Sequence, residues 1–227
     1  EVIRIGSYDP MKKVITLAAS HIYGIGRGTW GKKTRRFYAM NLIEELDAPG
    51  EWYIDRKTWR LYFLPPLNLH NTRIILATLT QPLIHISNAQ HIKLLGLIFE
   101  YSHGDGIILQ NTKGIEITGC RIANIGGNGV VIDGSENIIF SCDVYNIGRS
   151  GIILNGGNRK LLIPANNLVF NNHIHHFGLF QRTYAPGIAV SGCGQIVRNN
   201  RIHDAPHSAI IYGGNEHLFE LNEIYRV

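Results

Sequence analysis

Carboxylate and histidine side chains gather near the C-terminal end of the sequence. The segment HDAPHSAI holds Asp204 and His207, and Glu216 follows in the next turn-like segment. A histidine exchanges protons near neutral pH, and a carboxylate can serve as a base or a nucleophile. We therefore predict Asp204, His207 and Glu216 as a catalytic group that moves protons to and from a substrate hydroxyl or leaving group. Asp204 also falls at a turn position, where capping is the alternative role.

A second set of polar residues lies elsewhere in the sequence, either next to segments that we predict below to be strands or in insertions between those segments. We expect these residues to contact a substrate through hydrogen bonds and charge. They are His103, Asp105, Asp133, Arg159, Arg182, Tyr184 and His217. Turn hydrogen bonds are the alternative for the histidines, and Glu220 and Glu223 have stacking partners that indicate a structural role. The pattern shows no convincing pair of carboxyls.

No metal ion or cofactor is predicted. The histidines near residues 173–176 lack evident carboxylates to complete a metal site, and the spacing CxxC does not occur. No cluster of aspartates suits calcium. The three cysteines cannot form an even disulfide framework, and we expect Cys120 and Cys142 to be buried thiols.

A repeat in the amino-acid sequence predicts the fold that must position these candidate site residues. Blocks such as FNNHI and RNNRI align so that their third residues fall at 120, 142, 172, 200 and 222, which places successive blocks 22 to 30 residues apart. A short period with insertions is typical of a solenoid, in which each repeat forms one coil. When the blocks are aligned, the positions on either side of this third residue include two that are always apolar. The third residue itself is asparagine in the last three blocks, as Asn172, Asn200 and Asn222. Stacked asparagines at a bend would satisfy one another, so we predict an internal asparagine ladder.

A second strand in each coil begins with small residues in GDGIIL, GNGVVI, RSGIIL, APGIAV and HSAIIY. Three short strands per coil without helical periodicity predict an all-β fold, the right-handed parallel β-helix of the pectate-lyase-like kind. Insertions at 156–167 and 177–186 interrupt the period. Because insertions in solenoids collect on the binding face, we expect a groove along the face of these first strands.

The N-terminal third departs from the repeat. We predict a β-rich accessory module at 1–70, with a hairpin whose arms are Trp52–Asp55 and Arg60–Phe63, and β-helix coils over 71–227. An exposed tryptophan in this module would suit stacking on a sugar ring. The net charge of +5 owes much to lysines and arginines at 12–36, a segment we interpret as a solvated loop. Basic and aromatic residues do not interleave, so nucleic acid is not an expected partner.

Longer phrases carry a resemblance to a known family. They are NLIEELDAPGEWYID and LYFLPP, followed by NNHIHHFG, RTYAPGIAVSG, NNRIHDAPHSAI and GGNEHLFELNEI. Together they resemble bacterial parallel β-helix proteins that act on polysaccharides and include glycoside hydrolases such as an α-L-fucosidase and a xylanase. The resemblance covers about 36–224. One departure is Thr58-Trp59-Arg60, where relatives usually carry glycine in the hairpin turn.

The resemblance implies a glycoside hydrolase that cleaves a polysaccharide or oligosaccharide with paired carboxylates, in the secreted or periplasmic compartment. In this family an acidic Asp-Gly-Ala segment follows, so we expect this chain to be the N-terminal portion of a longer β-helix. A lyase acting on a uronate-containing glycan and a non-catalytic glycan-binding or adhesive β-helix are the alternatives. No membrane span is evident in the sequence.

Overall fold

The protein is represented by a computed structural model, which describes residues 2–21, 37–70 and 72–227. The contacts divide into two compact units, Ile5–Ile75 and Leu76–Val227, the latter together with Glu1–Arg4. The domain limits 1–70 and 71–227 stay a prediction. Of the basic segment singled out above, residues 22–36 lie outside the described part of the chain.

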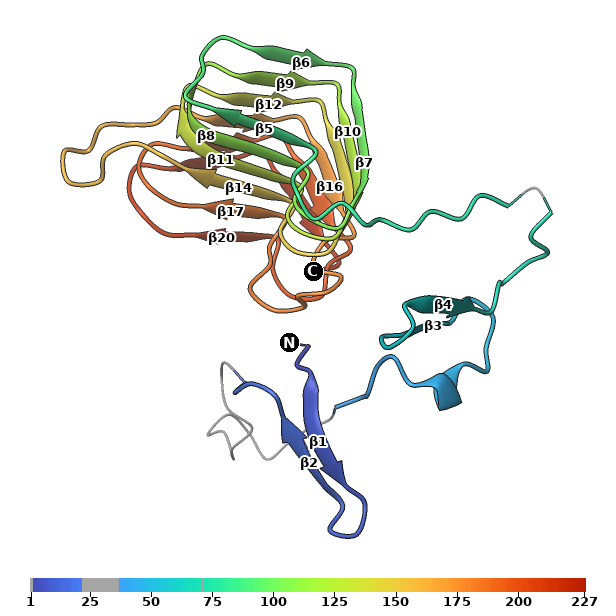
Figure 1. Ribbon diagram of the computed structural model, residues 1–227. Coiled ribbons are helices and arrows are strands. Elements are labelled where there is room, and N and C mark those ends of the chain that lie inside the picture. Colours follow the sequence, from blue (N-terminus) through green and yellow to red (C-terminus); the bar gives the residue numbers. More distant parts are fainter. Residues whose placement is uncertain (1, 22–36, 71) are drawn as a thin grey trace. The chain divides into compact units, whose positions relative to one another are not determined.

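The larger unit is a right-handed parallel β-helix of six coils, as predicted, and each coil contributes one strand to each of three parallel sheets (Figure 1). The first strands are β5 (Ile84–Ser87), β8 (Ile107–Lys113), β11 (Val130–Ser135), β14 (Ile152–Asn155), β17 (Ile188–Val190) and β20 (Ile210–Tyr212). The second strands are β6 (Lys93–Leu95), β9 (Glu116–Thr118), β12 (Ile138–Phe140), β15 (Leu168–Phe170), β18 (Ile196–Arg198) and β21 (Leu218–Glu220). The third strands are β7 (Ile98–Ser102), β10 (Arg121–Ile125), β13 (Asp143–Ile147), β16 (His173–His175), β19 (Arg201–His203) and β22 (Glu223–Tyr225).

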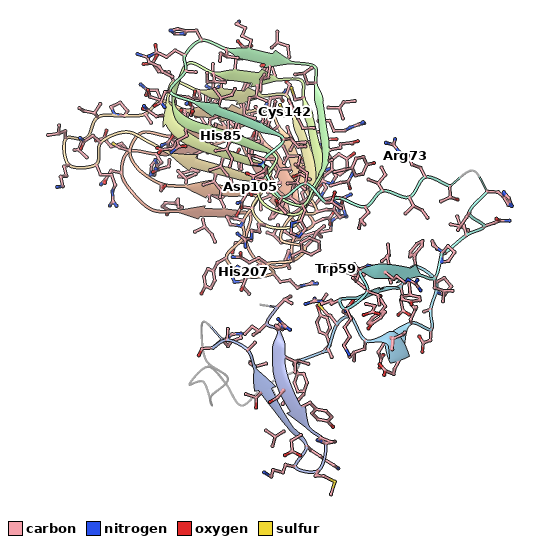
Figure 2. All side chains as sticks on the ribbon, in the orientation of Figure 1. Trp59, Arg73, His85, Asp105, Cys142 and His207 are labelled. Atoms are coloured by element: carbon pink, nitrogen blue, oxygen red, sulfur yellow. The ribbon has the colours of Figure 1, made fainter. Side chains whose placement is uncertain are left out.

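The interior carries the predicted asparagine ladder at the bend between the second and third strands. Asn172 Nδ2 donates to Asn200 Oδ1 over 3.0 Å, and Asn200 Nδ2 donates to Asn222 Oδ1 over 2.9 Å. The ladder continues into the preceding coil, because Asn172 Oδ1 accepts a hydrogen bond from the backbone N–H of Cys142. Cys142 is a buried thiol, and burial raises its pKa to about 12. Figure 2 shows this side chain within the solenoid.

A second internal ladder occupies the bend between the first and second strands, and the sequence analysis missed it. Asn137 Nδ2 donates to Asn167 Oδ1 over 2.9 Å, and Asn167 Nδ2 donates to Gln195 Oε1 over 3.0 Å. The last member is His217, whose Nδ1 accepts the backbone N–H of Gln195. Mixed Asn, Gln and His side chains serve one purpose here, so no single residue type marks the column.

Glycines at the start of the first strands owe their place to close approach between coils. A Cβ added at Gly106, Gly129 or Gly151 would lie 2.4–2.6 Å from the carbonyl oxygen of the next glycine in the column. From the sequence alone, glycine at a strand start indicates that the backbone leaves a tight turn. The structure gives a steric reason instead, because the backbone of the next coil occupies the position of a side chain.

The charge columns of the repeat predict two surface pairs, Arg121 with Asp143 and Arg201 with Glu223, and the apolar run at 74–76 predicts the first strand of the coils. Two of these three predictions were wrong. Arg121 lies beside Asp143 in register, but its ion pair is with Glu100 in the preceding coil, at 3.0 Å. Residues 74–76, expected as the first strand, have no strand pairing, and the solenoid's first described strand is β5. The other predicted surface pair, Arg201 with Glu223, is present at 2.7 Å.

The smaller unit holds two antiparallel hairpins and one short 3₁₀ helix. They are β1 (Ile5–Asp9) with β2 (Val14–Leu17), β3 (Trp52–Asp55) with β4 (Arg60–Phe63), and η1 (Ile43–Glu45). The arms of the second hairpin are those predicted. Trp59 in its turn has a φ of 57° and is 79% exposed, and glycine adopts such a left-handed conformation more readily than tryptophan does. No helix among the described residues is long and apolar enough to cross a bilayer.

Candidate functional site

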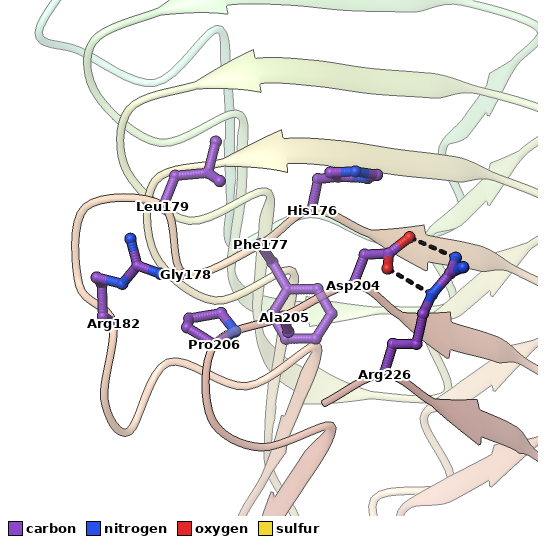
Figure 3. A pocket seen from close by; sticks show the side chains of 9 residues that line it. All are labelled: His176, Phe177, Gly178, Leu179, Arg182, Asp204, Ala205, Pro206 and Arg226. Atoms are coloured by element: carbon purple, nitrogen blue, oxygen red, sulfur yellow. Dashed lines mark hydrogen bonds and ion pairs between the residues drawn. The ribbon is translucent and has the colours of Figure 1, made fainter.

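A pocket of about 440 Å³ opens where the chain leaves the third strands of the fourth and fifth coils (Figure 3). Its walls come from the start of the insertion after β16 and from the turn after β19. The lining residues are His176, Phe177, Gly178, Leu179, Arg182, Asp204, Ala205, Pro206 and Arg226. The structure thus brings together two residues predicted from the sequence, Asp204 and Arg182. This pocket lies at the turns after the third strands, whereas the groove was expected on the face of the first strands.

Asp204 is the charged centre of the pocket. Its carboxylate accepts from two nitrogens of the Arg226 guanidinium, Nε and Nη2, at 2.6 and 2.7 Å, and lies 2.8 Å from His203 Nδ1. Partial desolvation raises the pKa of Asp204, but the hydrogen bonds from His203 and Arg226 outweigh it and hold the pKa below its ordinary value. An ionised carboxylate at this place suits a base, a nucleophile or a hydrogen-bond acceptor, and does not suit a general acid.

Exposed aromatic rings stand on the same insertion. Phe180 is 67% exposed and Tyr184 is 61% exposed. The ring of Tyr184 lies against that of His207, with 5.2 Å between ring centroids, so a second pair of predicted residues is in contact. His207 Nδ1 also lies 2.7 Å from Ser208 Oγ, and Figure 2 shows His207 on a loop that projects from the coils. Exposed rings beside polar groups can stack on apolar faces of a ligand.

The other predicted residues lie apart from the pocket lining, and four of them make hydrogen bonds within the solenoid: Asp105, Asp133, Arg159 and His217. Asp105 accepts the backbone N–H of Asn128 over 2.6 Å, beside His103 in the turn before β8. Asp133, an exposed residue on β11, accepts a hydrogen bond at Oδ1 from Asn155 Nδ2 over 3.2 Å. Arg159 donates from the first insertion to Asn215 Oδ1 over 3.1 Å, next to Glu216 and His217 in the turn before β21. Their substrate contacts and the catalytic role of Glu216 stay predictions.

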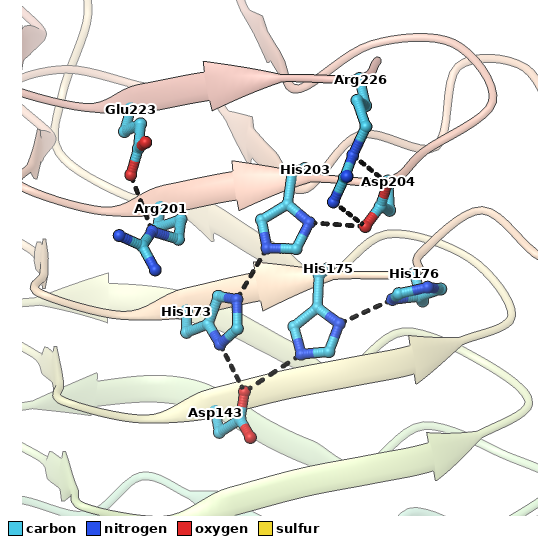
Figure 4. Close-up of polar contacts among 9 residues, drawn as sticks. All are labelled: Asp143, His173, His175, His176, Arg201, His203, Asp204, Glu223 and Arg226. Carbon is cyan, nitrogen blue, oxygen red and sulfur yellow. Dashed lines mark hydrogen bonds and ion pairs between the residues drawn. The ribbon is translucent and has the colours of Figure 1, made fainter.

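The outward face of the third strands carries a cluster that the sequence analysis did not assemble (Figure 4). Asp143, on β13, lies directly beside His173 in the parallel register, and His175 follows two residues later on the same face. His173 Nδ1 and His175 Nε2 both lie 3.3 Å from Asp143 Oδ1. The missing carboxylate is therefore supplied by the preceding coil. Comparing outward positions two residues apart on successive third strands would have revealed the cluster.

A stack of rings extends along the same face. Tyr145 stacks on His175, His175 on His203, and His203 on Tyr225, with ring centroids 5.0, 5.2 and 4.5 Å apart. The rings are nearly parallel because one strand position repeats in successive coils. His203 Nε2 lies 2.7 Å from His173 Nε2, so the stack connects the Asp143 cluster to Asp204.

The two imidazoles of this cluster, His173 and His175, are partly withdrawn from water. Desolvation is the largest cause that lowers the pKa of His173 and of His175, and neighbouring histidines lower both further. Asp143 opposes this effect with its negative charge, but the net direction is downward for both rings. Neutral imidazoles with free lone pairs are the form that binds a metal ion or accepts a proton.

The comparison with known proteins agrees with the fold. The model of a family described as "Right handed beta helix region" matches residues 82–185, which span the first four coils. Neither a curated protein nor a solved structure gives a significant match. The fold and the match define the class as right-handed parallel β-helix, a fold consistent with polysaccharide-related proteins in general. They do not distinguish a hydrolase, a lyase or a binding protein.

Proposed function

We propose that this β-helix binds and hydrolyses a carbohydrate polymer at the pocket around Asp204. The observation that carries the proposal is one combination of groups: an ionised carboxylate, two guanidinium groups and the exposed rings of Phe180 and Tyr184 on one insertion. Sugar rings present hydroxyls to charged planar groups and apolar faces to aromatic rings. The resemblance in sequence to polysaccharide-active β-helix proteins supports the same class of ligand.

In this proposal Asp204 acts as the base or nucleophile of the reaction, since its lowered pKa keeps it ionised. His207 is the proposed proton donor to the leaving group, and Tyr184 orients it through ring contact. Among the described residues that line the pocket, Asp204 carries the one carboxylate. Hydrolysis by two carboxylates would therefore need a second acid from outside this lining.

A lyase acting on an acidic glycan is the second candidate, because Arg182 and Arg226 line the same pocket. A guanidinium group pairs well with the carboxylate of a uronate, and neutralising that charge is what eliminative cleavage requires. In either case we propose a secreted or periplasmic location, where polysaccharides occur as substrates.

The test is digestion of a panel of neutral and acidic glycans by the 227-residue chain, with analysis of the products. New reducing ends without an unsaturated chromophore would support hydrolysis. An unsaturated uronate product would support a lyase. Binding without cleavage would leave a glycan-binding protein, and neither binding nor cleavage would refute the proposal.

Asp204→Asn and Glu220→Gln form the matched pair of variants. We expect Asp204→Asn to lower turnover about 100-fold or more, because it removes the ionised group. Glu220 pairs with Arg198 on the second-strand face, so its amide variant should keep normal turnover. Equal activity of the two variants would remove Asp204 from the reaction.

A further inference from the structure

Three potential ligand atoms converge on the outward face of β13 and β16. They are Asp143 Oδ1, His173 Nδ1 and His175 Nε2, which all lie within 4.8 Å of one another. Within the described parts of the chain, they form the one group of three or more such side chains close enough to share an ion. All three side chains are partly exposed, which leaves a route for an ion from solvent.

The spacing fits a small divalent ion. Ligands at about 2.0–2.1 Å from a tetrahedral centre lie about 3.3 Å from one another. Each imidazole nitrogen lies 3.3 Å from Asp143 Oδ1, which equals this ligand-to-ligand separation. Two histidines and one carboxylate are also a donor set that zinc and related divalent transition metals accept.

Asp143 Oδ1 is itself unsatisfied. It is shielded from solvent and has no hydrogen-bond partner within the described residues, although two ring nitrogens lie near it. A buried carboxylate oxygen without a donor is costly. An ion between the oxygen and the two nitrogens would satisfy all three atoms at once.

The hydrogen-bond network assigns the tautomer of His173 in the form that binds a metal. Ionised Asp204 must accept from His203 Nδ1, 2.8 Å away. In the neutral form of His203, Nε2 then accepts from His173 Nε2–H across 2.7 Å. A neutral His173 is left with a lone pair on Nδ1, which faces Asp143 Oδ1 without a proton between them.

His175 can adopt the matching tautomer. Its Nδ1 lies 2.7 Å from His176 Nδ1, so donation from His175 to His176 leaves the lone pair of His175 on Nε2. That nitrogen faces the same carboxylate oxygen.

We propose that Asp143, His173 and His175 bind one zinc-like divalent transition-metal ion, with His203 and Asp204 positioning His173 for coordination. Three protein ligands leave a coordination position for water or a ligand oxygen on the outer face. This site is separate from the proposed catalytic chemistry at the pocket. The two are linked through the contact of His203 with His173 and Asp204, and through His175, whose Nδ1 lies 2.7 Å from Nδ1 of the pocket residue His176.

The test is calorimetric titration of the 227-residue chain, purified without a polyhistidine tag, with Zn²⁺ alone. We expect saturable binding of one equivalent. The variants Asp143→Asn, His173→Gln and His175→Gln should each lose that binding. The control is His85→Gln, which alters a histidine on β5 of the first-strand sheet and should bind as the unaltered protein does.

Two further measurements separate coordination from nonspecific binding. His203→Phe keeps a ring in the stack but loses both hydrogen bonds, and we expect about 10- to 100-fold weaker binding from this positioning residue. Co²⁺ should give visible absorption typical of nitrogen and oxygen ligands in the unaltered protein and not in Asp143→Asn. Circular dichroism without metal should show the same fold for every variant. The proposal is overturned if the unaltered protein shows no saturable binding, or if Asp143→Asn binds equally well.

Discussion

The first-strand and third-strand faces of this β-helix have the same repeat but different chemistry. On the first-strand face, Ile108, Val131 and Ile153 lie in register, and beside them Asp133, Asn155 and Ser191 bond to one another. On the third-strand face, rings and charged groups meet, and an oxygen of Asp143 lacks a partner. A face whose polar groups satisfy one another indicates a structural surface, whereas unsatisfied groups indicate a site.

The largest expected effect comes from the interior that supports both faces. Asn172→Ala would leave the N–H of Cys142 and the carbonyl of Ile139 without their partners. We expect a loss of about 3 kcal/mol in the free energy of unfolding, because each buried group left unpaired costs about 1–3 kcal/mol. Urea denaturation measures it.

The matched control for that variant is Asn155→Ala on the first-strand face, where the side chain is exposed. A change within about 0.5 kcal/mol is expected there. Equal effects of the two variants would mean that the internal ladder has no special role.

The second effect tests the close approach of coils along the first-strand sheet. Gly151→Ala places a Cβ 2.6 Å from the carbonyl oxygen of Gly187, so the coils must shift. We expect a loss of about 1–3 kcal/mol in thermal or urea unfolding.

Gly213→Ala is its control, since an added Cβ there meets nothing within 4 Å. It should unfold at or above the midpoint of the unaltered protein. If both alanine variants behave alike, the steric account of the glycine column is incorrect.

The smallest effect concerns the ring stack of the third-strand face. Tyr225 stacks on His203 with 4.5 Å between centroids, and Tyr225→Ala removes that contact. A loss of about 0.5–1.5 kcal/mol is expected, because stacked aromatic pairs contribute that much beyond their area. Tyr225→Phe keeps the ring and should retain the stability; a loss as large as that of the alanine variant would assign the effect to the hydroxyl.

Much of the fold could be predicted because stacking turns a sequence period into spatial contact. The columns containing Asn172, Asn200 and Asn222 and the limits of the hairpin at 52–63 followed from residue types alone. The ladder through Asn137, Asn167 and Gln195 was missed because its members differ in type. Periodicity shows which positions repeat, but mixed polar side chains can share one structural task.

The site was harder to predict than the fold. Asp204 and Arg182 were selected, and the pocket brings them together because one insertion bends back over the turn after β19. The cluster of Asp143 with His173 and His175 combines one residue of the third coil with two residues of the fourth coil, which occupy two different positions of the same strand. Asp143 and His173 share one column, but His175 belongs to the column two positions along, so a search along single columns separates it from the other two.

Hydroxyl-radical footprinting with a glycan selected from the digestion panel tests the assignment of the site most directly. Its readout is the oxidation of side chains on each face. The account predicts that the glycan protects Phe180, Tyr184 and His207 and leaves Ile153 and Tyr212 on the first-strand sheet unchanged. Protection of Ile153 and Tyr212 with none at Phe180 or Tyr184 would place the ligand on the first-strand face and contradict the account.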